Sequence, residues 1–315
     1  IVGKVQKAAK DISIDEKKQT PHYLSLLIRS ATSERHRFPG TKYSLLLQHL
    51  ENIGLTQNFL KYIRKPCTAE NLSVAHKASY IDKIQTGSLS RENQIRLGLP
   101  WSETLRQRSF IAPNGTLLAA QLALQTGIAC HAAGGTHHAH WDFGAGFCVF
   151  NDLAYAARAL IAMELAKRVL ILDCDVHQGD GTAQILSNDS NVLTCSIHCA
   201  ENYPEKKAIS DLDFSISKGS DDYYYLAVLD RCLGQIDRSN FSPDFVLYNA
   251  AVDVHRNDKL GRLEMTSEGI YERDKVVLSH FKKKQVPIAT TIGGGYGKAH
   301  QEVAQRHSII FQAVK

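Results

Sequence analysis

The chain has 315 residues, of which 43% are hydrophobic and 22% charged, a balance typical of a globular protein with a large core. The formal net charge of +5 is mild, and the lysines at 282–284 are interpreted as a solvated helix face, so we expect no direct binding of nucleic acid. No run of about 20 apolar residues predicts a membrane span. Residues 1–20 lack the apolar centre of a signal peptide.

The seven cysteines indicate a reducing compartment. They are odd in number, form no CxxC pair and mostly lie in apolar segments, which predicts buried, reduced thiols. We therefore expect a cytoplasmic protein, and keep a nuclear enzyme or an exported effector acting in a host as alternatives. Oligomeric state is not predicted.

The first hundred residues have a less regular pattern than the rest. Helices are expected near 41–52 and 56–62, followed by loops through RLGLPWSETLRQRSF at 96–110. We expect this segment to cover the main sheet rather than to form a separate domain, with residues 1–35 as an N-terminal extension.

From about residue 114, short apolar runs alternate with longer amphipathic stretches. Strands are predicted at 127–130, 168–172, 191–197, 245–250 and 286–292. Helices are predicted at 114–126, 151–166, 220–238, 266–284 and 299–312. Continuous apolar runs suit parallel strands that are covered on both faces. The alternation predicts one doubly wound α/β domain over 1–315.

The polar chemistry is concentrated where these strands end, which is where open α/β sheets bind ligands. DCDVHQGDGT follows one apolar run, and Asp173, Asp175 and His177 alternate in it. In an extended segment they would project to one side, where a divalent metal would satisfy them. Asp175 and His177, with Asp253 from NAAVDVH, predict a metal site with an open position for water, which indicates catalysis. The alternative is a set of caps and turn-forming aspartates.

Two adjacent histidines, His137 and His138, lie in a glycine-flanked loop. Asp173 and Asp180 are spare carboxylates that could fix their tautomers, giving a general base and a general acid. The alternatives are a surface histidine pair and, for Asp180, a GDG turn.

Aromatic residues at the ends of two other loops complete the predicted site. Tyr296, after three glycines, could donate to a developing oxyanion, or simply pack on a glycine turn. Phe147 in GAGFCVF is interpreted as a channel wall or a core aromatic. His198 and His255 also follow strands and are interpreted as structural histidines.

These motifs together resemble one known family. GGTHHA, DCDVHQGDGT, AAVDVHRNDKLG and GGGY, in this order, are similar to those of the zinc-dependent histone deacetylases of the arginase/deacetylase superfamily. HRFP at 36–39, LGLPWS at 97–102 and the HQGDG variant are most similar to class IV and its bacterial homologues. The resemblance implies an α/β arginase/deacetylase fold, with a central, mainly parallel, eight-stranded sheet flanked by helices.

The resemblance also implies roles for individual residues. Asp175, His177 and Asp253 would bind one catalytic Zn²⁺, His137 and His138 would be backed by Asp173 and Asp180, and Tyr296 would bind the substrate carbonyl. The acyl-lysine channel would be lined by Phe147, Tyr203, Gly146 and Gly294. A structural K⁺ would be held by Asp173, Asp175, His177, Ser196 and Ile197.

The implied activity is hydrolysis of Nε-acyl-lysine in a protein or peptide, with histone tails as a candidate substrate and chromatin regulation as a candidate role. An acetylpolyamine or other small-molecule amidohydrolase is the first alternative, although no acidic gate is evident. An arginase would need further carboxylates, and Gly179 stands where arginases have another aspartate. A catalytically silent acyl-lysine binder would not need both His–Asp pairs. No counterpart of the family's substrate-anchoring rim aspartate is evident.

Overall fold

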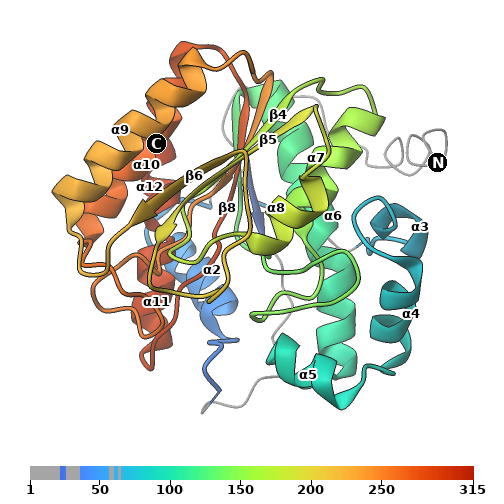
Figure 1. Ribbon diagram of the computed structural model, residues 1–315. Coiled ribbons are helices and arrows are strands. Elements are labelled where there is room, and N and C mark those ends of the chain that lie inside the picture. Colours follow the sequence, from blue (N-terminus) through green and yellow to red (C-terminus); the bar gives the residue numbers. More distant parts are fainter. Residues whose placement is uncertain (1–21, 26–35, 57–59, 63–64) are drawn as a thin grey trace.

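The computed structural model describes residues 22–25, 36–56, 60–62 and 65–315, and Figure 1 shows one sheet flanked by helices. The sheet has eight strands in the order β2-β1-β3-β8-β7-β4-β5-β6, and every neighbouring pair is parallel. The strands are β1 (His22–Ser25), β2 (Leu60–Tyr62), β3 (Ile128–His131), β4 (Val169–Asp173), β5 (Val192–Cys199), β6 (Leu212–Ile216), β7 (Phe245–Asn249) and β8 (Ile288–Thr291). The predicted α/β fold with a parallel sheet is confirmed.

Helices cover both faces of this sheet because parallel strands need crossover connections. In Figure 1, α6, α7 and α8 lie on one side of the sheet, and α9, α10 and α12 lie on the other. The helices are α2 (Lys42–Asn52), α3 (Ala69–Leu72), α4 (Ala78–Thr86), α5 (Arg91–Leu97), α6 (Glu103–Thr126), α7 (Asp152–Ala162), α8 (Asp180–Leu186), α9 (Asp222–Arg238), α10 (Ser267–Lys283), α11 (His300–His307) and α12 (Ile309–Val314). None of the helices in the described part of the chain could cross a membrane.

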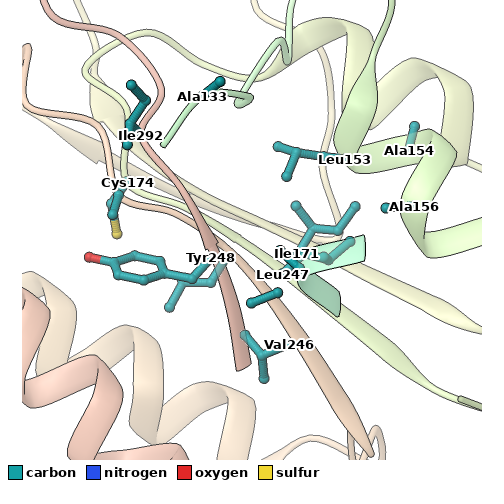
Figure 2. Close-up of a cluster of buried hydrophobic side chains, with 14 of the residues drawn as sticks. Ala133, Leu153, Ala154, Ala156, Ile171, Cys174, Val246, Leu247, Tyr248 and Ile292 are labelled. Carbon is teal, nitrogen blue, oxygen red and sulfur yellow. The ribbon is translucent and has the colours of Figure 1, made fainter. Parts of the chain in front are cut away.

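The core is formed where the central strands meet the helices on both faces. All five residues of β4 and all five of β7 are buried. Figure 2 shows Ile171 facing Leu153 and Ala156 of α7, whereas Tyr248 lies on the other side of the sheet. On that side the Tyr248 hydroxyl donates to Asp274 Oδ1 of α10 at 2.6 Å. Strands buried on both faces need the continuous apolar runs seen in the sequence.

Several expected elements differ from the structure. Within the expected helix at 56–62, residues 57–59 lie outside the described residues, and Leu60–Tyr62 is a strand, so that expectation is wrong. The loops expected over 96–110 are also wrong, because α5 and α6 occupy most of this segment. Helix α6 begins after Ser102, whose side chain accepts from the Leu105 amide and caps it, and it continues through Pro113.

Three further differences concern the middle and the ends of the chain. Strand β6 was not expected, because its burial alternates and it lies at the edge of the sheet. The helix expected over 299–312 is divided at Ser308 into α11 and α12. Of the expected extension 1–35, only β1 is described, and the remainder lies outside the described residues.

The strand order explains why distant motifs meet. Strands β3, β8, β7, β4 and β5 are consecutive neighbours, and in a parallel sheet their carboxyl ends share one edge. The loops that follow them carry the histidine pair, GGGY, NAAVDVH and DCDVHQGDGT. These four loops therefore form one site.

Candidate active site and metal centre

Three buried side chains converge at the carboxyl edge of the sheet. Asp175 and His177 lie in the connection from β4 to α8, and Asp253 lies just after β7. One ligand atom from each lies within 4.8 Å of the other two. The His177 Nδ1 is 2.9 Å from Asp175 Oδ1 and 3.1 Å from Asp253 Oδ2. The sequence-predicted ligands are thus brought together.

Asp173, Asp175 and His177 do not alternate along one extended strand, as the sequence had predicted. Strand β4 ends at Asp173, and the Asp175 amide donates to Asp173 Oδ1 at 3.1 Å. The His177 amide likewise donates to Asp175 Oδ1 at 3.0 Å. In each of these two turns an aspartate side chain accepts from the amide two residues later. The turns separate Asp173, which is bonded to His137, from Asp175 and His177.

Backbone amides hold both oxygens of Asp175 and one oxygen of Asp253. Gly294 N donates to Asp175 Oδ2 at 2.8 Å, and Val176 N donates to Asp253 Oδ1 at 2.9 Å. Asp253 Oδ2 is buried, and although His177 Nδ1 lies 3.1 Å away, this oxygen accepts no well-aligned hydrogen bond from the described residues. A Cβ on Gly294 would lie 2.0 Å from this oxygen and 2.6 Å from Asp175 Oδ2. Glycine therefore keeps a small polar space open between the two carboxylates.

The electrostatics of this group favour a cation. Burial, together with the neighbouring Asp175 carboxylate, raises the pKa of Asp253 to about 7. Although burial opposes it, His137 and His177 hold the pKa of Asp175 well below its ordinary value. Two buried carboxylates and one imidazole, with an unpartnered oxygen between them, fit a divalent metal, and the donor set suits zinc with an open position.

Beside this centre, each histidine of the pair is bonded to its own carboxylate. His137 Nδ1 lies 2.6 Å from Asp173 Oδ2, and His138 Nδ1 lies 2.6 Å from Asp180 Oδ1. Since an ionised carboxylate only accepts hydrogen bonds, both Nδ1 atoms carry protons. Each Nε2 is therefore left to act on a ligand, and His137 Nε2 is 3.8 Å from Asp175 Oδ1.

The two imidazoles have different proton affinities. Burial lowers the pKa of both, but Asp173 and Asp175 outweigh burial at His137 and raise its pKa to about 9. At His138, burial and the neighbouring His137 lower the pKa to about 4 despite Asp180. Beyond the two Nδ1 protons, the pair can therefore hold one additional proton near neutral pH, at Nε2 of His137, while Nε2 of His138 stays free.

Tyr296 lies at the end of the glycine loop that follows β8. Its amide donates to Asp258 Oδ2 at 2.6 Å, and its ring centroid is 6.3 Å from that of His177 and 5.9 Å from that of Phe147. Burial, followed by the negative charge of Asp175, raises the pKa of the phenol well above its ordinary value. The phenol is therefore a neutral hydrogen-bond donor close to the metal ligands.

A cleft of about 700 Å³ leads from the surface to this group and is lined by His138, His177, Phe147, Tyr203 and Tyr296, among others. The Tyr203 and His138 rings are 4.8 Å apart in an edge-on contact. Phe147 has a φ of 67°, a conformation costly for a large side chain.

Glycine is required next to this aromatic wall, because a Cβ on Gly146 would lie 2.6 Å from His138 Cδ2. Gly146 lines both this cleft and a smaller cavity of about 50 Å³. Gly294, which was predicted to line the channel, lines only the smaller cavity, together with His137 and His138.

Comparison with known proteins agrees with this geometry. The model of the histone deacetylase domain matches residues 36–313. The chain belongs to the histone deacetylase family. Membership supports a hydrolase that acts on amide bonds.

Individual relatives of this histone deacetylase family member extend over most of the chain. An uncharacterised protein of Picosynechococcus sp. is 44% identical over 282 residues, covering 90% of this chain and 94% of the relative. Histone deacetylase 2 of Arabidopsis thaliana is 29% identical over 279 residues, covering 85% and 71%. The crystal structure of a histone deacetylase homologue complexed with SAHA shares the fold, with a TM-score of 0.79 at 22% identity, covering 94% of this chain and 84% of that one.

The residues of the predicted potassium site are also neighbours. Ser196 of β5 is paired in register with Asp173 of β4, and Ile197 follows it. The Ser196 hydroxyl lies 3.0 Å from His198 Nδ1. His198 and His255 lie outside the metal-ligand group found among the described residues, and their structural role stays a prediction. A cation at Asp173 and Ser196 stays a prediction.

One departure from the common family motif has a structural explanation. Gln178 is buried and points away from the metal ligands. Its Nε2 donates to Asp213 Oδ1 at 2.8 Å and to the Ala208 carbonyl oxygen at 3.0 Å, and its Oε1 accepts from the Ala208 amide. Gln178 therefore ties β6, through Asp213, and the segment before it, through Ala208, to the loop that carries the ligands.

Several residues that support this deacetylase-family site were not predicted from the sequence. Asn249 Nδ2 donates to Asp173 Oδ1 at 2.8 Å, and His140 Nε2 lies 3.2 Å from Asp180 Oδ2. The buried Lys42 Nζ donates to the Gly293 carbonyl oxygen at 3.1 Å, below the glycine loop. Asp258 holds the Tyr296 amide. Only Asn249 had a signal in the sequence, because it is a polar residue near the end of the predicted strand 245–250.

Proposed function

We propose that this protein is a zinc-dependent deacetylase that hydrolyses Nε-acyl-lysine in proteins or peptides. The proposal is supported by one arrangement: the three candidate metal ligands and the two His–Asp pairs lie at the inner end of a cleft with aromatic walls. A cleft with aromatic walls suits an extended aliphatic chain such as that of lysine. The homologue complexed with SAHA is consistent with such a ligand.

The zinc ligands would be Asp175, His177 and Asp253. When bound, zinc supplies polarisation of the amide carbonyl and lowers the pKa of water to about 7. The phenol of Tyr296 would donate to the carbonyl oxygen as negative charge develops on it. Phe147 and Tyr203 would lie along the lysine methylenes and exclude water from them.

Proton transfer would be carried out by the histidine pair. Because Asp173 and Asp180 occupy the Nδ1 atoms, each histidine would exchange protons through Nε2. His138, which lines the cleft and whose lowered pKa leaves its Nε2 unprotonated, would take the proton of the attacking water and then give it to the departing lysine amine. The protonated His137 would stabilise the negative charge that develops beside it. A K⁺ beside Asp173 and Ser196 would have a structural role.

The test is an assay of the full chain, after metal analysis, with an acetyl-lysine peptide that carries uncharged flanking residues. We expect wild-type protein containing one zinc to release acetate. The Tyr296→Phe variant should lose about 100- to 1,000-fold in kcat, because it removes a donor to the developing oxyanion, and should keep its metal content and folded circular dichroism spectrum. Full activity of a correctly loaded Tyr296→Phe protein would contradict the mechanism.

A further inference from the structure

The outer end of the cleft is strongly basic. It is bordered by residues around 36–37, 95–98, 202–203 and 259–262. Three of these segments contribute cations, and the segment 202–203 does not. The cations are all exposed: Arg37, Arg96, Lys259 and Arg262. No aspartate or glutamate is among the described residues that line the cleft.

Most of this charge is not neutralised by neighbours. Arg96 is paired with Glu92 at 2.9 Å, but Arg37, Lys259 and Arg262 form no ion pair within the described ranges. The guanidinium of Arg262 donates to the main-chain carbonyl of Glu201. The Glu201 carboxylate accepts from the Lys218 amide at 2.9 Å and also interacts electrostatically with Arg262, so the charge of Arg262 is partly offset, whereas Arg37 and Lys259 keep theirs.

The unpaired cations lie on more than one side of the channel entrance. The Lys259 amide donates to the Tyr296 carbonyl oxygen at 3.3 Å, so the main chains of Lys259 and Tyr296 are neighbours, and both residues line the cleft. Arg37 follows His36, whose ring is in edge-on contact with Phe147 at 5.9 Å. Arg262 is beside the Tyr203 loop through Glu201. A substrate whose acyl-lysine enters the channel must therefore bring its flanking residues close to these charges.

We propose that the preferred substrate is an acyl-lysine flanked by acidic side chains in an extended peptide segment, an inference that rests on the proposed deacetylase function. Carboxylates two or three residues from the acyl-lysine would meet Arg37, Lys259 and Arg262, and a cleft focuses this field. Flanking lysines or arginines, and the free amines of an acetylated polyamine, would be repelled by the same charges. The rim thus selects against cationic substrates.

The test compares matched peptides of equal length, capped at both termini, in which acetyl-lysine is flanked by glutamate, glutamine or lysine, together with an acetylated polyamine. We expect kcat/KM at about 20 mM salt to be about tenfold higher for the glutamate peptide than for the lysine peptide. The ratio should shrink at about 500 mM salt, where surface charges are screened. The glutamine peptide should lie between the two.

Variants of the exposed cations test whether the preference for acidic flanking residues comes from the outer end of the cleft. The Arg37→Gln/Lys259→Gln protein should lose several-fold of the glutamate-to-lysine ratio, whereas Lys282→Gln, on the distant helix α10, should retain it. Because each ratio is measured on one protein sample, partial misfolding cancels. Equal rates on all three peptides, or faster turnover of the polyamine, would overturn the inference while leaving deacetylase function intact. If the zinc-loaded protein hydrolyses none of the substrates, the proposed function itself fails.

Discussion

The guanidinium of Arg273 donates to the carbonyl oxygen of Ala251 at 2.7 Å. Arg273 is completely buried in α10, and Ala251 lies two residues before the candidate metal ligand Asp253. The same guanidinium lies 3.4 Å from the Cys174 carbonyl oxygen, just before Asp175. Arg273 thus joins the two loops that present the carboxylate ligands, and Asp274 balances its charge through a hydrogen bond of 2.9 Å.

Replacing Arg273 with methionine should lower the free energy of unfolding by about 3–5 kcal/mol, because it leaves the buried Asp274 carboxylate uncompensated. Urea denaturation measures this loss. The conservative change Asp237→Asn, in a half-exposed ion pair with Lys284, should cost about 1 kcal/mol or less. A methionine variant as stable as the wild type would show that the link between the two loops contributes little.

We expect glycine to be required at position 294 because a side chain there would fill the space between Asp175 and Asp253, not because the backbone needs a conformation that only glycine adopts. A Cβ there would lie 2.0 Å from Asp253 Oδ2, so Gly294→Ala should displace a ligand and weaken zinc binding about 10- to 100-fold. Zinc retained after dialysis against a graded series of chelator concentrations gives the affinity. As a control, Gly234→Ala on α9 meets only the end of the flexible Arg238 side chain and should bind zinc normally. Equal affinities for the two variants would argue against a metal between Asp175 and Asp253.

His138 and His140 both contact Asp180, at 2.6 and 3.2 Å, but they should differ in their effect on catalysis. His138 lines the cleft, whereas His140 does not. His138→Ala should lower kcat by about 100- to 10,000-fold, since it removes a proton-transfer group. His140→Ala should lower it by less than about tenfold. Initial rates at saturating peptide separate the two, and similar losses would mean that Asp180, rather than His138, carries the effect.

Stability should depend on pH through His76, which is far from the metal ligands in sequence and fully buried. Its Nε2 accepts from the Asn151 amide at 2.8 Å, its Nδ1 faces the His140 carbonyl oxygen, and burial lowers its pKa to about 4. Below about pH 6.5 the unfolded chain binds a proton that the folded chain excludes. Stability is therefore full above this pH and falls as pH decreases toward 4.

The His76→Gln variant removes this titration and should unfold more easily at neutral pH, but its stability should change less between about pH 6.5 and 4.5. The difference in slope, measured by denaturant titration at several pH values, tests the assignment. Parallel curves for the two proteins would mean that His76 does not contribute.

The central site was predictable because its signals are local. Continuous apolar runs marked β4 and β7, and the polar residues that follow them had to lie at one edge of a parallel sheet. Lys42 and Arg273 were not predictable, since lysine and arginine in amphipathic helices usually face solvent. Here each is buried because backbone carbonyls accept its hydrogen bonds. The basic rim likewise comes from loops far apart in sequence.

The most direct test of the account is acetate release from an uncharged-flank acetyl-lysine peptide by metal-free protein, zinc-reconstituted protein and zinc-treated Asp175→Asn protein. The account predicts that activity rises with zinc and saturates near one equivalent, and that the Asp175→Asn protein is at least about 100-fold less active. Equal activity in metal-free and reconstituted protein, or no acetate release by protein that holds one zinc, would contradict it.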